Sequence, residues 1–310
     1  GVQWVVENRD AYNIKVLNLS FAARPRWPYW LDPINQAIMR AWAAGITVVA
    51  AAGNEGPEPM TIGSPGNLPY IITVGAVTDS WTVDNPNDDY VPAFSSQGPT
   101  PSAHIKPDLV APGGHITGIT RPGSTLATTF PEYYLATGEF VMTGTSQAAA
   151  LVSGLVALLM QLEPEITPDE VKCKLTSSAN LAINRDGRLA YSPFQQGHGY
   201  VSLTRAITLG TRNCGNQGMD IQKDIAGEDR YQGPAIMRED GTVSLPGLDT
   251  MYIGPGPDAP SNELRWGVKA HIEREDALPE SAGDPNLPFD WEGIYQRERA
   301  RMEQLANPAG

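Results

Sequence analysis

One uncharged run constrains this chain more than any other feature. Residues 144–159 read Gly-Thr-Ser-Gln-Ala-Ala-Ala-Leu-Val-Ser-Gly-Leu-Val-Ala-Leu-Leu and contain neither charge nor proline. The length of the run favours a helix over a strand, and its apolar character on nearly every face predicts a buried helix. Ser146 falls in the first turn, where unpaired N–H groups and the positive end of the helix dipole meet. A serine there serves either as a cap or as a nucleophile whose developing oxyanion those N–H groups stabilise.

The sequence before and after this run alternates between apolar stretches and helical patterns. Strands are expected at 16–20, 46–52, 70–77, 93–96 and 108–111, and helices at 2–8, 33–44, 168–179 and 201–207. Gly45 is a natural helix stop, and Thr167-Pro168-Asp169-Glu170 combines an N-cap, a proline at the first position and a capping-box glutamate. Continuous apolar strands that alternate with helices predict an α/β fold with a mainly parallel sheet and helices on both faces.

The composition changes after residue 212. Residues 213–310 hold 18 acidic against 9 basic side chains, and glycine and proline become frequent. We therefore expect a core over 1–212 and an irregular acidic extension over 213–310, with one amphipathic helix near 290–305. The net charge of −13 argues against nucleic acid or an anionic membrane as a partner. It suits a secreted or extracellular protein, although no signal peptide is visible in this chain.

Three smaller features leave alternatives open. Cys173 and Cys214 are compatible with one disulfide, but two cysteines do not decide the redox compartment. Trp27, Tyr29 and Trp30 either line a substrate groove or pack on a loop. An acidic loop is more readily a solvated surface than a calcium site, because it lacks the spacing of an EF-hand. Its oxygen-bearing side chains are Asp79, Asp84, Asn85, Asn87, Asp88 and Asp89.

Several stretches together resemble the subtilases, the subtilisin-like serine peptidases. Gly144-Thr145-Ser146-Gln147-Ala148 is similar to the nucleophile motif of that family, and Ala51-Ala52-Gly53-Asn54-Glu55-Gly56 is similar to its oxyanion-hole segment. Four further stretches match in the family's order: 16–20, 64–76, 94–99 and 106–113. The six matches cover roughly residues 1–210, and the tail from about 213 shows none. The resemblance implies peptide hydrolysis through an acyl-enzyme at Ser146. It also implies that Asn54 and the backbone N–H of Ser146 stabilise the oxyanion, and it allows a structural calcium ion but no other cofactor.

The chain departs from the family pattern in the residues that form the catalytic base. The triad of that family runs Asp, His, Ser along the chain, and neither the Asp motif nor the His-Gly-Thr-His motif appears in residues 1–310. The histidines are His104, His115, His198 and His271, and each is expected to be structural or at the surface. Gln147 replaces the usual Met, and Ala149-Ala150-Leu151 stands where the family usually has Pro and His. The helix should tolerate both changes.

Three functions remain open from the sequence. In the first, the chain is the C-terminal part of a subtilase, and an upstream segment supplies the missing Asp and His. In the second, the chain hydrolyses activated esters by itself. An oxyanion hole and substrate binding alone still accelerate such a reaction over the rate in water, even without the other triad members. In the third, it is a non-catalytic scaffold with the same fold. A sheet without its first strands exposes an edge, so we expect the tail, the missing N-terminal segment or self-association to cover it.

Overall fold

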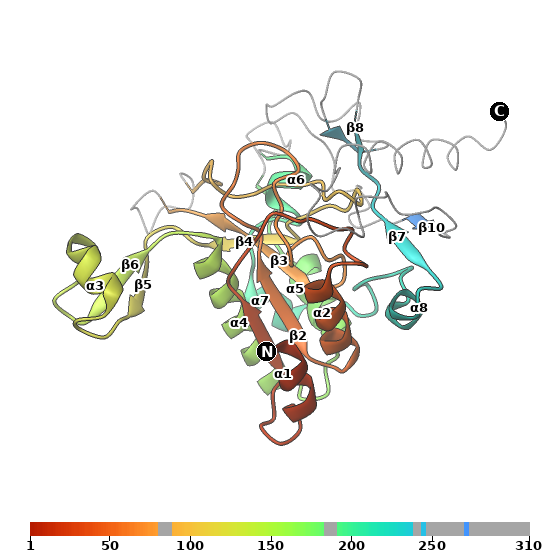
Figure 1. Ribbon diagram of the computed structural model, residues 1–310, viewed down its shortest axis with the longest axis horizontal. Coiled ribbons are helices and arrows are strands. Elements are labelled where there is room, and N and C mark those ends of the chain that lie inside the picture. Colours follow the sequence, from red (N-terminus) through yellow and green to blue (C-terminus); the bar gives the residue numbers. More distant parts are fainter. Residues whose placement is uncertain (80–88, 183–190, 238–242, 246–269, 273–310) are drawn as a thin grey trace.

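A four-stranded parallel sheet forms the centre of the protein in the computed structural model (Figure 1), which describes residues 1–79, 89–182, 191–237, 243–245 and 270–272. The strands are β1 (Val16–Leu19), β2 (Thr47–Ala51), β3 (Ile72–Val77) and β4 (Leu109–Pro112), hydrogen-bonded in that order. Leu19 pairs with Ala50, Val49 with Ile72, and Val74 with Leu109. β2 and β3 are buried along their whole length, which explains their largely apolar sequence. The predicted parallel sheet is confirmed.

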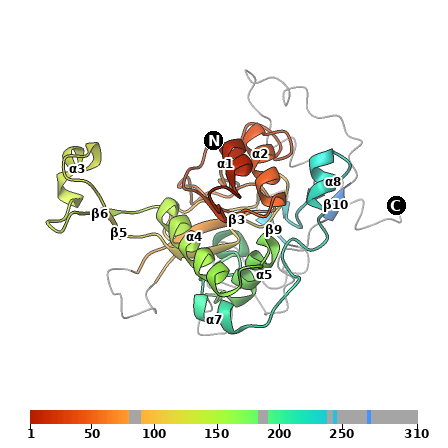
Figure 2. The same cartoon turned by 90° about the horizontal axis from the view of Figure 1, so that it is seen from below.

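Helices cover both faces of this sheet, as the alternating pattern predicts (Figure 2). One face carries α1 (Val2–Asn8) and α2 (Pro33–Ala43), and the other carries α4 (Thr145–Leu162), α5 (Pro168–Ser178) and the short α7 (Leu203–Thr208). Asp32 caps α2 by accepting from two backbone N–H groups, and Gly45 follows the helix with φ +88°. The capping box of α5, from Thr167 and Glu170, is present as expected.

Helix α4 packs against all four strands, but it is less buried than its sequence predicts. Its inner face, which includes Ala148, Val152 and Val156, is fully buried, whereas Leu158 is 47% and Leu162 is 59% exposed. The expected buried helix is therefore buried on one face only, because the sheet covers only that face. By length and composition α4 is also apolar enough to cross a membrane, and its place on the sheet is that of a core helix.

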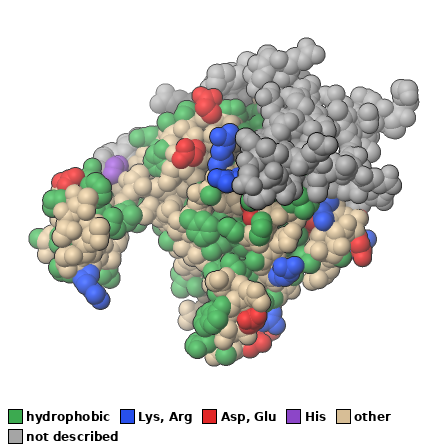
Figure 3. Space-filling view, in the orientation of Figure 1, with side chains coloured by type: hydrophobic (Ala, Val, Ile, Leu, Met, Phe, Trp, Pro, Cys, Tyr) green, Lys and Arg blue, Asp and Glu red, His purple; other side chains and the backbone are tan. Residues whose placement is uncertain are grey.

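An arm projects from the body between β4 and α4 and was not expected from the sequence (Figure 1, left). It consists of the hairpin β5 (Ile116–Ile119) and β6 (Glu139–Met142), with α3 (Thr125–Thr129) and η1 (Pro131–Tyr133) at its end. Apolar side chains gather on its surface (Figure 3). The short strand expected at 93–96 is absent from this described stretch. It is a turn, whose serine hydroxyls accept hydrogen bonds from Ala76 and Glu55 backbone N–H groups.

The described part of the C-terminal extension is attached to the core. Cys173 of α5 forms a disulfide with Cys214, which settles the pairing that the sequence left open. The remaining short elements are α6 (Pro193–Gln196), α8 (Ile221–Ala226), β7 (Arg230–Gln232), β8 (Ile236–Met237), β9 (Val243–Ser244) and β10 (Ala270–Ile272). Asp224 of α8 is buried and accepts hydrogen bonds from the hydroxyls of Tyr29 and Tyr70 at 2.8 and 2.9 Å. The helix expected at 290–305 lies outside the described residues.

A buried charge cluster joins the amino ends of β3 and β4 to α5. Asp108 accepts from Lys106 at 2.5 Å and pairs with Lys172 at 3.2 Å, and all three side chains are buried. Both ammonium groups also donate to backbone carbonyls, Lys106 to Ile71 and Lys172 to Pro69. Burial alone would raise the pKa of the Asp108 carboxyl, but the charges of Lys106 and Lys172 outweigh it and hold that pKa below its usual range. Asp108 is therefore ionised and neutralises part of two buried positive charges.

We predict that Asp108→Asn lowers the free energy of unfolding by about 3–5 kcal/mol, because it leaves the buried ammonium groups without their counter-charge. Urea unfolding measures the change. Asp10→Asn is the matched control, since the Asp10 side chain is 91% exposed and its loss should matter little. A loss below about 1 kcal/mol at Asp108 would contradict the assigned ion pairs.

The same cluster predicts a pH dependence with a definite sign. A carboxyl whose pKa is lowered by folding contributes stability above the pKa of the unfolded chain, about 3.9 for Asp, and loses it as the pH falls through the folded value. The native protein should therefore lose stability below about pH 4 more steeply than Asp108→Asn does. Parallel slopes in urea titrations between pH 5 and 2 would contradict this.

Candidate active site

Ser146 and Asn54 lie on the same cavity, although 91 residues separate the chain segments that carry them. Ser146 is in the first turn of α4, and Asn54 follows the carboxyl end of β2. The cavity has a volume of about 650 Å³. Asn54 is exposed and Ser146 is partly exposed, so both are accessible from solvent. The fold thus brings together the two residues that the sequence selected.

Thr145 fixes the orientation of the Asn54 side chain. The backbone N–H and the hydroxyl of Thr145 both donate to Asn54 Oδ1, each at 3.0 Å. A backbone N–H requires an acceptor, so this contact identifies which end of the amide is oxygen. The Nδ2 group is consequently the donor end, for which the described residues provide no acceptor, and it lies beside Gly144, where a Cβ atom added to the glycine would be 3.3 Å from it. Asn54 therefore presents N–H groups near the start of α4.

The first turn of α4 supplies a second donor. Gly144 is the N-cap and has no side chain to satisfy the turn. The N–H of Thr145 is used by Asn54, and those of Gln147 and Ala148 point to the carbonyl of Gly144. Among the residues that the structure describes, the N–H of Ser146 has no hydrogen-bond acceptor. Two N–H donors, one from a side chain and one from the backbone, thus accompany the Ser146 hydroxyl.

The Ser146 hydroxyl is held by the end of β1. Ser146 Oγ donates to the carbonyl of Ser20 at 3.0 Å, and Ser20 Oγ donates to the carbonyl of Ser146 at 2.8 Å. These reciprocal bonds hold the turn that carries Ser146 against the end of the strand. A carbonyl oxygen is too weak a base to remove the serine proton, so this hydroxyl is positioned but not activated.

Two of the described histidine rings have partners away from Ser146. His104 is fully buried, with Nε2 3.1 Å from the carbonyl of Tyr231, and its ring contacts Tyr29. His198 Nδ1 lies 2.9 Å from the carbonyl of Asp108, at the amino end of β4 and away from the site. His115 donates its backbone N–H to Thr143 Oγ1. His271 lies in β10, where only the backbone is described. In the described part of the chain, Ser146 Oγ has no hydrogen bond to an imidazole or a carboxylate.

The cavity walls come from three segments around the two site residues. They are 22–25 after β1, 51–55 at the end of β2, and 58–63. Ala23 and Ser64 pair as an antiparallel bridge that closes one end. A Cβ atom at Gly63 would be 2.7 Å from the Cβ of Ala22, so a glycine is needed where these walls approach. Glu55, Glu58 and Arg24 are exposed at the cavity, and the other lining residues are mostly small or apolar.

The remaining sequence candidates fall elsewhere. Tyr29 and Trp30 are buried and pack together, which favours the packing interpretation over the groove. Asp79 and Asp89 flank residues 80–88, so the centre of the acidic loop lies outside the described residues. No group of three metal-ligating side chains occurs within the described ranges. Sequence reasoning missed the roles of Thr145 and Ser20. Thr145 lies inside the Gly-Thr-Ser turn, and that position is the sequence signal that could have indicated its role.

We predict that Thr145→Val lowers the free energy of unfolding by about 1–3 kcal/mol, because it leaves the buried N–H of Gly53 without its acceptor, Thr145 Oγ1. Thr47→Val is the matched control. Thr47 is a buried threonine of β2 whose hydroxyl has no partner among the described residues, so the same substitution should be neutral or stabilising there. Equal effects in urea unfolding would contradict the role of Thr145.

Comparisons with known proteins identify the family of this chain. The model of the subtilase family matches residues 1–199. Serine protease AprX of Bacillus subtilis is 40% identical over 177 residues, which are 56% of this chain and 40% of AprX. Subtilisin amylosacchariticus is 31% identical over 186 residues, or 59% and 39% of the two chains. This chain therefore spans about 40% of the length of these relatives.

Two solved structures support the fold. The S41 psychrophilic protease aligns with a TM-score of 0.51 at 22% identity, covering 65% of this chain and 61% of its own. Sphericase aligns with a TM-score of 0.50 at 22% identity, covering 64% and 61%. The motifs around Ser146 and Asn54, the parallel sheet between two helix layers and the family match lead to one conclusion: this chain belongs to the subtilase family of serine peptidases.

Proposed function

We propose that this chain supplies the nucleophile and the oxyanion hole of a serine endopeptidase. The observation that carries the proposal is the fixed amide of Asn54, whose oxygen is bound by Thr145 and whose N–H groups remain available beside Ser146. Donors that are held in place before the reaction stabilise a developing negative charge without reorganising. Peptides are the proposed substrates, and activated esters are easier substrates of the same site.

The proposed reaction begins when Ser146 Oγ attacks the carbonyl carbon of the scissile peptide bond and gives its proton to a base. The carbonyl oxygen becomes an oxyanion and accepts hydrogen bonds from Asn54 Nδ2 and from the Ser146 N–H. The C–N bond then breaks, the amine leaves with the proton from the base, and Ser146 carries the acyl group. Water attacks the ester in the same way and releases the acid.

We propose that the base and its carboxylate come from polypeptide outside residues 1–310. The Ser146 hydroxyl donates to the carbonyl of Ser20, and the rings of His104 and His198 contact the carbonyls of Tyr231 and Asp108. Strand β1 pairs with β2 on one side, and its Val16 and Leu17 are only half-buried. An open strand beside the nucleophile is a suitable place for a segment that brings a histidine.

The Cys173–Cys214 disulfide supports a location in an oxidising compartment, such as the cell exterior. Disulfides persist in secreted proteins and are rare in reducing compartments. The bond also ties the start of the 213–310 extension to α5, so the extension begins as part of the folded body. We therefore propose that the protein is extracellular and acts on peptides there.

We predict that Ser146→Ala abolishes peptide hydrolysis by the full-length protein and its labelling by a fluorophosphonate. Asn54→Ala should lower kcat about 10²–10³-fold. This is the magnitude known for the loss of one oxyanion-hole donor in a subtilisin, and we apply it to this chain by analogy. Ser153→Ala is the matched control, because this serine lies on the same helix and bonds to Asn18 and Ala149 rather than to the site. Mass spectrometry of the labelled peptide checks the residue.

Different results would point to the other functions. Labelling of a residue other than Ser146, or full activity in Asn54→Ala, would contradict the proposed site. Hydrolysis of a p-nitrophenyl ester by chain 1–310 alone, lost in Ser146→Ala, would show that the chain needs no added base for easy substrates. No labelling in full-length, folded protein would contradict catalysis and favour a scaffold.

We predict that chain 1–310 self-associates through the surface around β1. Trp4 of α1 is 52% exposed and Leu158 of α4 is 47% exposed, and the open strand lies between these two helix layers. Trp4→Lys with Leu158→Lys should shift the mass from light scattering toward the monomer, because charge opposes apolar contact. Ile207→Lys changes an equally exposed residue of α7 and serves as control. A monomeric native chain would contradict this prediction.

A further inference from the structure

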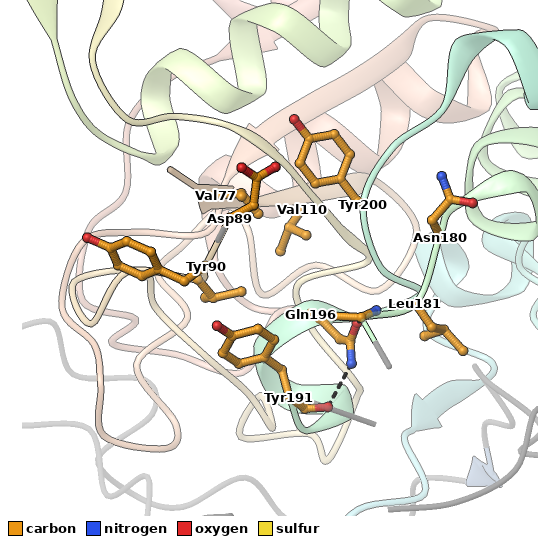
Figure 4. A pocket seen from close by; sticks show the side chains of 11 residues that line it. Val77, Asp89, Tyr90, Val110, Asn180, Leu181, Tyr191, Gln196 and Tyr200 are labelled. Atoms are coloured by element: carbon orange, nitrogen blue, oxygen red, sulfur yellow. Dashed lines mark hydrogen bonds between the residues drawn. The ribbon is translucent and has the colours of Figure 1, made fainter. Parts of the chain in front are cut away.

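The outer edge of β4 is closed to a further strand. Val110 N–H donates to the carbonyl of Gly199 at 2.9 Å, and Val201 N–H donates to the carbonyl of Val110 at 3.0 Å. A cavity of about 470 Å³ lies beside these residues, with Tyr191 and Tyr200 among its walls (Figure 4). The backbone of β4 at Val110 therefore has partners on both sides. The arm between β4 and α4 is different, because one of its strands has an unpaired edge.

The arm, residues 115–143, exposes apolar side chains and carries little charge. It holds one basic side chain, Arg121, against two acidic ones, Glu132 and Glu139, so it contributes −1 to the net charge of −13. Its exposed large apolar side chains are Ile119, Leu126, Phe130, Tyr133, Leu135 and Met142. Apolar side chains that gather at the surface indicate an interaction site. The low charge also weakens the repulsion between this surface and another copy of the acidic chain.

The base of the arm is fixed to the body. The N–H of Gly113 donates to the carbonyl of Val77 at 2.9 Å, and the N–H of Gly144 donates to the carbonyl of Gly113 at 2.8 Å. The backbone N–H of His115 donates to Thr143 Oγ1 at 2.9 Å. Both strands of the hairpin thus leave the body from hydrogen-bonded residues, and the hairpin projects away from it (Figures 1 and 2).

The two outer edges of the hairpin differ. On the β6 side, the N–H of Leu135 donates to the carbonyl of Glu139 at 2.7 Å, and Tyr134 forms an antiparallel bridge with Phe140. The arm itself thus covers that edge. On the other side, β5 has β6 as its single strand neighbour among the described elements. The outer edge of β5 therefore lacks a strand partner in this part of the chain.

The register identifies the backbone groups that β5 presents at this edge. The N–H of Thr120 donates to the carbonyl of Gly138 at 3.1 Å, so these two residues form a hydrogen-bonded pair. Such pairs alternate with non-hydrogen-bonded pairs along an antiparallel ladder, so Gly118 is the next residue that bonds to β6. Thr117 and Ile119 therefore direct their N–H and C=O groups outward, and the described residues supply no partner for them.

The edge carries none of the features that usually prevent strand pairing. Natural sheets protect their edges with charged side chains, proline or a bulge. Residues 116–120 read Ile-Thr-Gly-Ile-Thr and contain neither charge nor proline. Thr117 and Gly118 are exposed, and Ile119 is 95% exposed. A Cβ atom at Gly118 would have no atom within 4 Å, so its backbone can be approached closely.

We propose that β5 pairs antiparallel with β5 of a second copy of this chain, about a twofold axis that passes through Gly118. In this register Thr117 lies opposite the partner's Ile119, and Ile119 lies opposite the partner's Thr117. Both are hydrogen-bonded pairs, because these residues direct their backbone groups outward. Gly118 meets the partner's Gly118 in a non-hydrogen-bonded pair, where Cα atoms come within about 4.5 Å. Two arms thereby form one four-stranded sheet.

A second copy fits this edge because the edge is complementary to itself. Thr117 and Ile119 are equally spaced about Gly118, so a half turn places each donor opposite an acceptor. The pairing brings the exposed Ile119 against the side chain of the partner's Thr117 and removes apolar surface from water. It also adds strands to a two-stranded hairpin, which is marginally stable by itself in water. The proposal does not depend on the peptidase activity proposed above.

Introduced cysteines test the register. The two cysteines of the chain form a disulfide with each other, so an added thiol is free to cross-link. Under mild oxidation, chain 1–310 with Gly118→Cys should form disulfide-linked dimers, because Cα atoms about 4.5 Å apart suit a disulfide. Thr117→Cys should cross-link about tenfold more slowly, since residue 117 faces residue 119 of the other copy. Gly210→Cys is the matched control, because Gly210 is also exposed with open space around it, and it should not cross-link.

A second pair of variants tests the hydrogen bonds. Thr117→Pro removes an outward N–H that β6 does not use, so the hairpin should persist while the dimer loses one donor from each copy. We expect the dimer dissociation constant, measured by analytical ultracentrifugation, to rise at least about tenfold. Thr117→Val is the matched control. It keeps the N–H and the branched side chain, and it should dimerise as the native chain does.

Both measurements are repeated in the variant Trp4→Lys with Leu158→Lys, which separates the arm from the association expected around β1. Dimers cross-linked through Gly118→Cys in that variant would support pairing of the arms. No cross-link at Gly118→Cys, an equally fast cross-link at Thr117→Cys or Gly210→Cys, or a native dissociation constant in Thr117→Pro would each overturn the proposal.

Discussion

The hydroxyl of Thr145 is the contact on which the rest of the site depends. It accepts from the N–H of Gly53 and donates to Asn54 Oδ1, so it joins the start of α4 to the end of β2. Because α4 packs against all four strands, its first turn cannot move without the sheet. One small side chain thereby sets the position of Ser146, the orientation of Asn54 and the direction of two N–H donors.

Much of the fold could be predicted from the sequence because apolar periodicity reports burial. Val48–Ala51 is a continuous apolar run and Ile72–Val77 is apolar except for Thr73, and both lie in buried strands. The same reasoning failed at 93–96, where Ser95 and Ser96 use their hydroxyls to bind backbone N–H groups and form a turn. It also overestimated the burial of α4, since composition cannot tell which face of an apolar helix meets the sheet.

The site was predicted from motifs rather than from geometry. The sequence indicated Ser146 and Asn54, but it could not show that Thr145 binds the amide oxygen or that Ser20 holds the nucleophile's hydroxyl. Buried Lys106 and Lys172 were equally invisible, because lysine is normally exposed. Such roles depend on which backbone groups the fold leaves unpaired, and no local pattern encodes that.

The two edges of the sheet suit different partners. At the outer edge of β4, residues 199–201 already pair with Val110, so a new strand cannot join there and what remains is a cavity between fixed walls. At β1 the described residues provide a partner on one side only, and apolar side chains of α1 and α4 flank the strand. An open edge with apolar borders favours pairing with a whole segment. Because Ser20 directly follows β1 and accepts from the Ser146 hydroxyl, a segment that paired with β1 would lie close to Ser146.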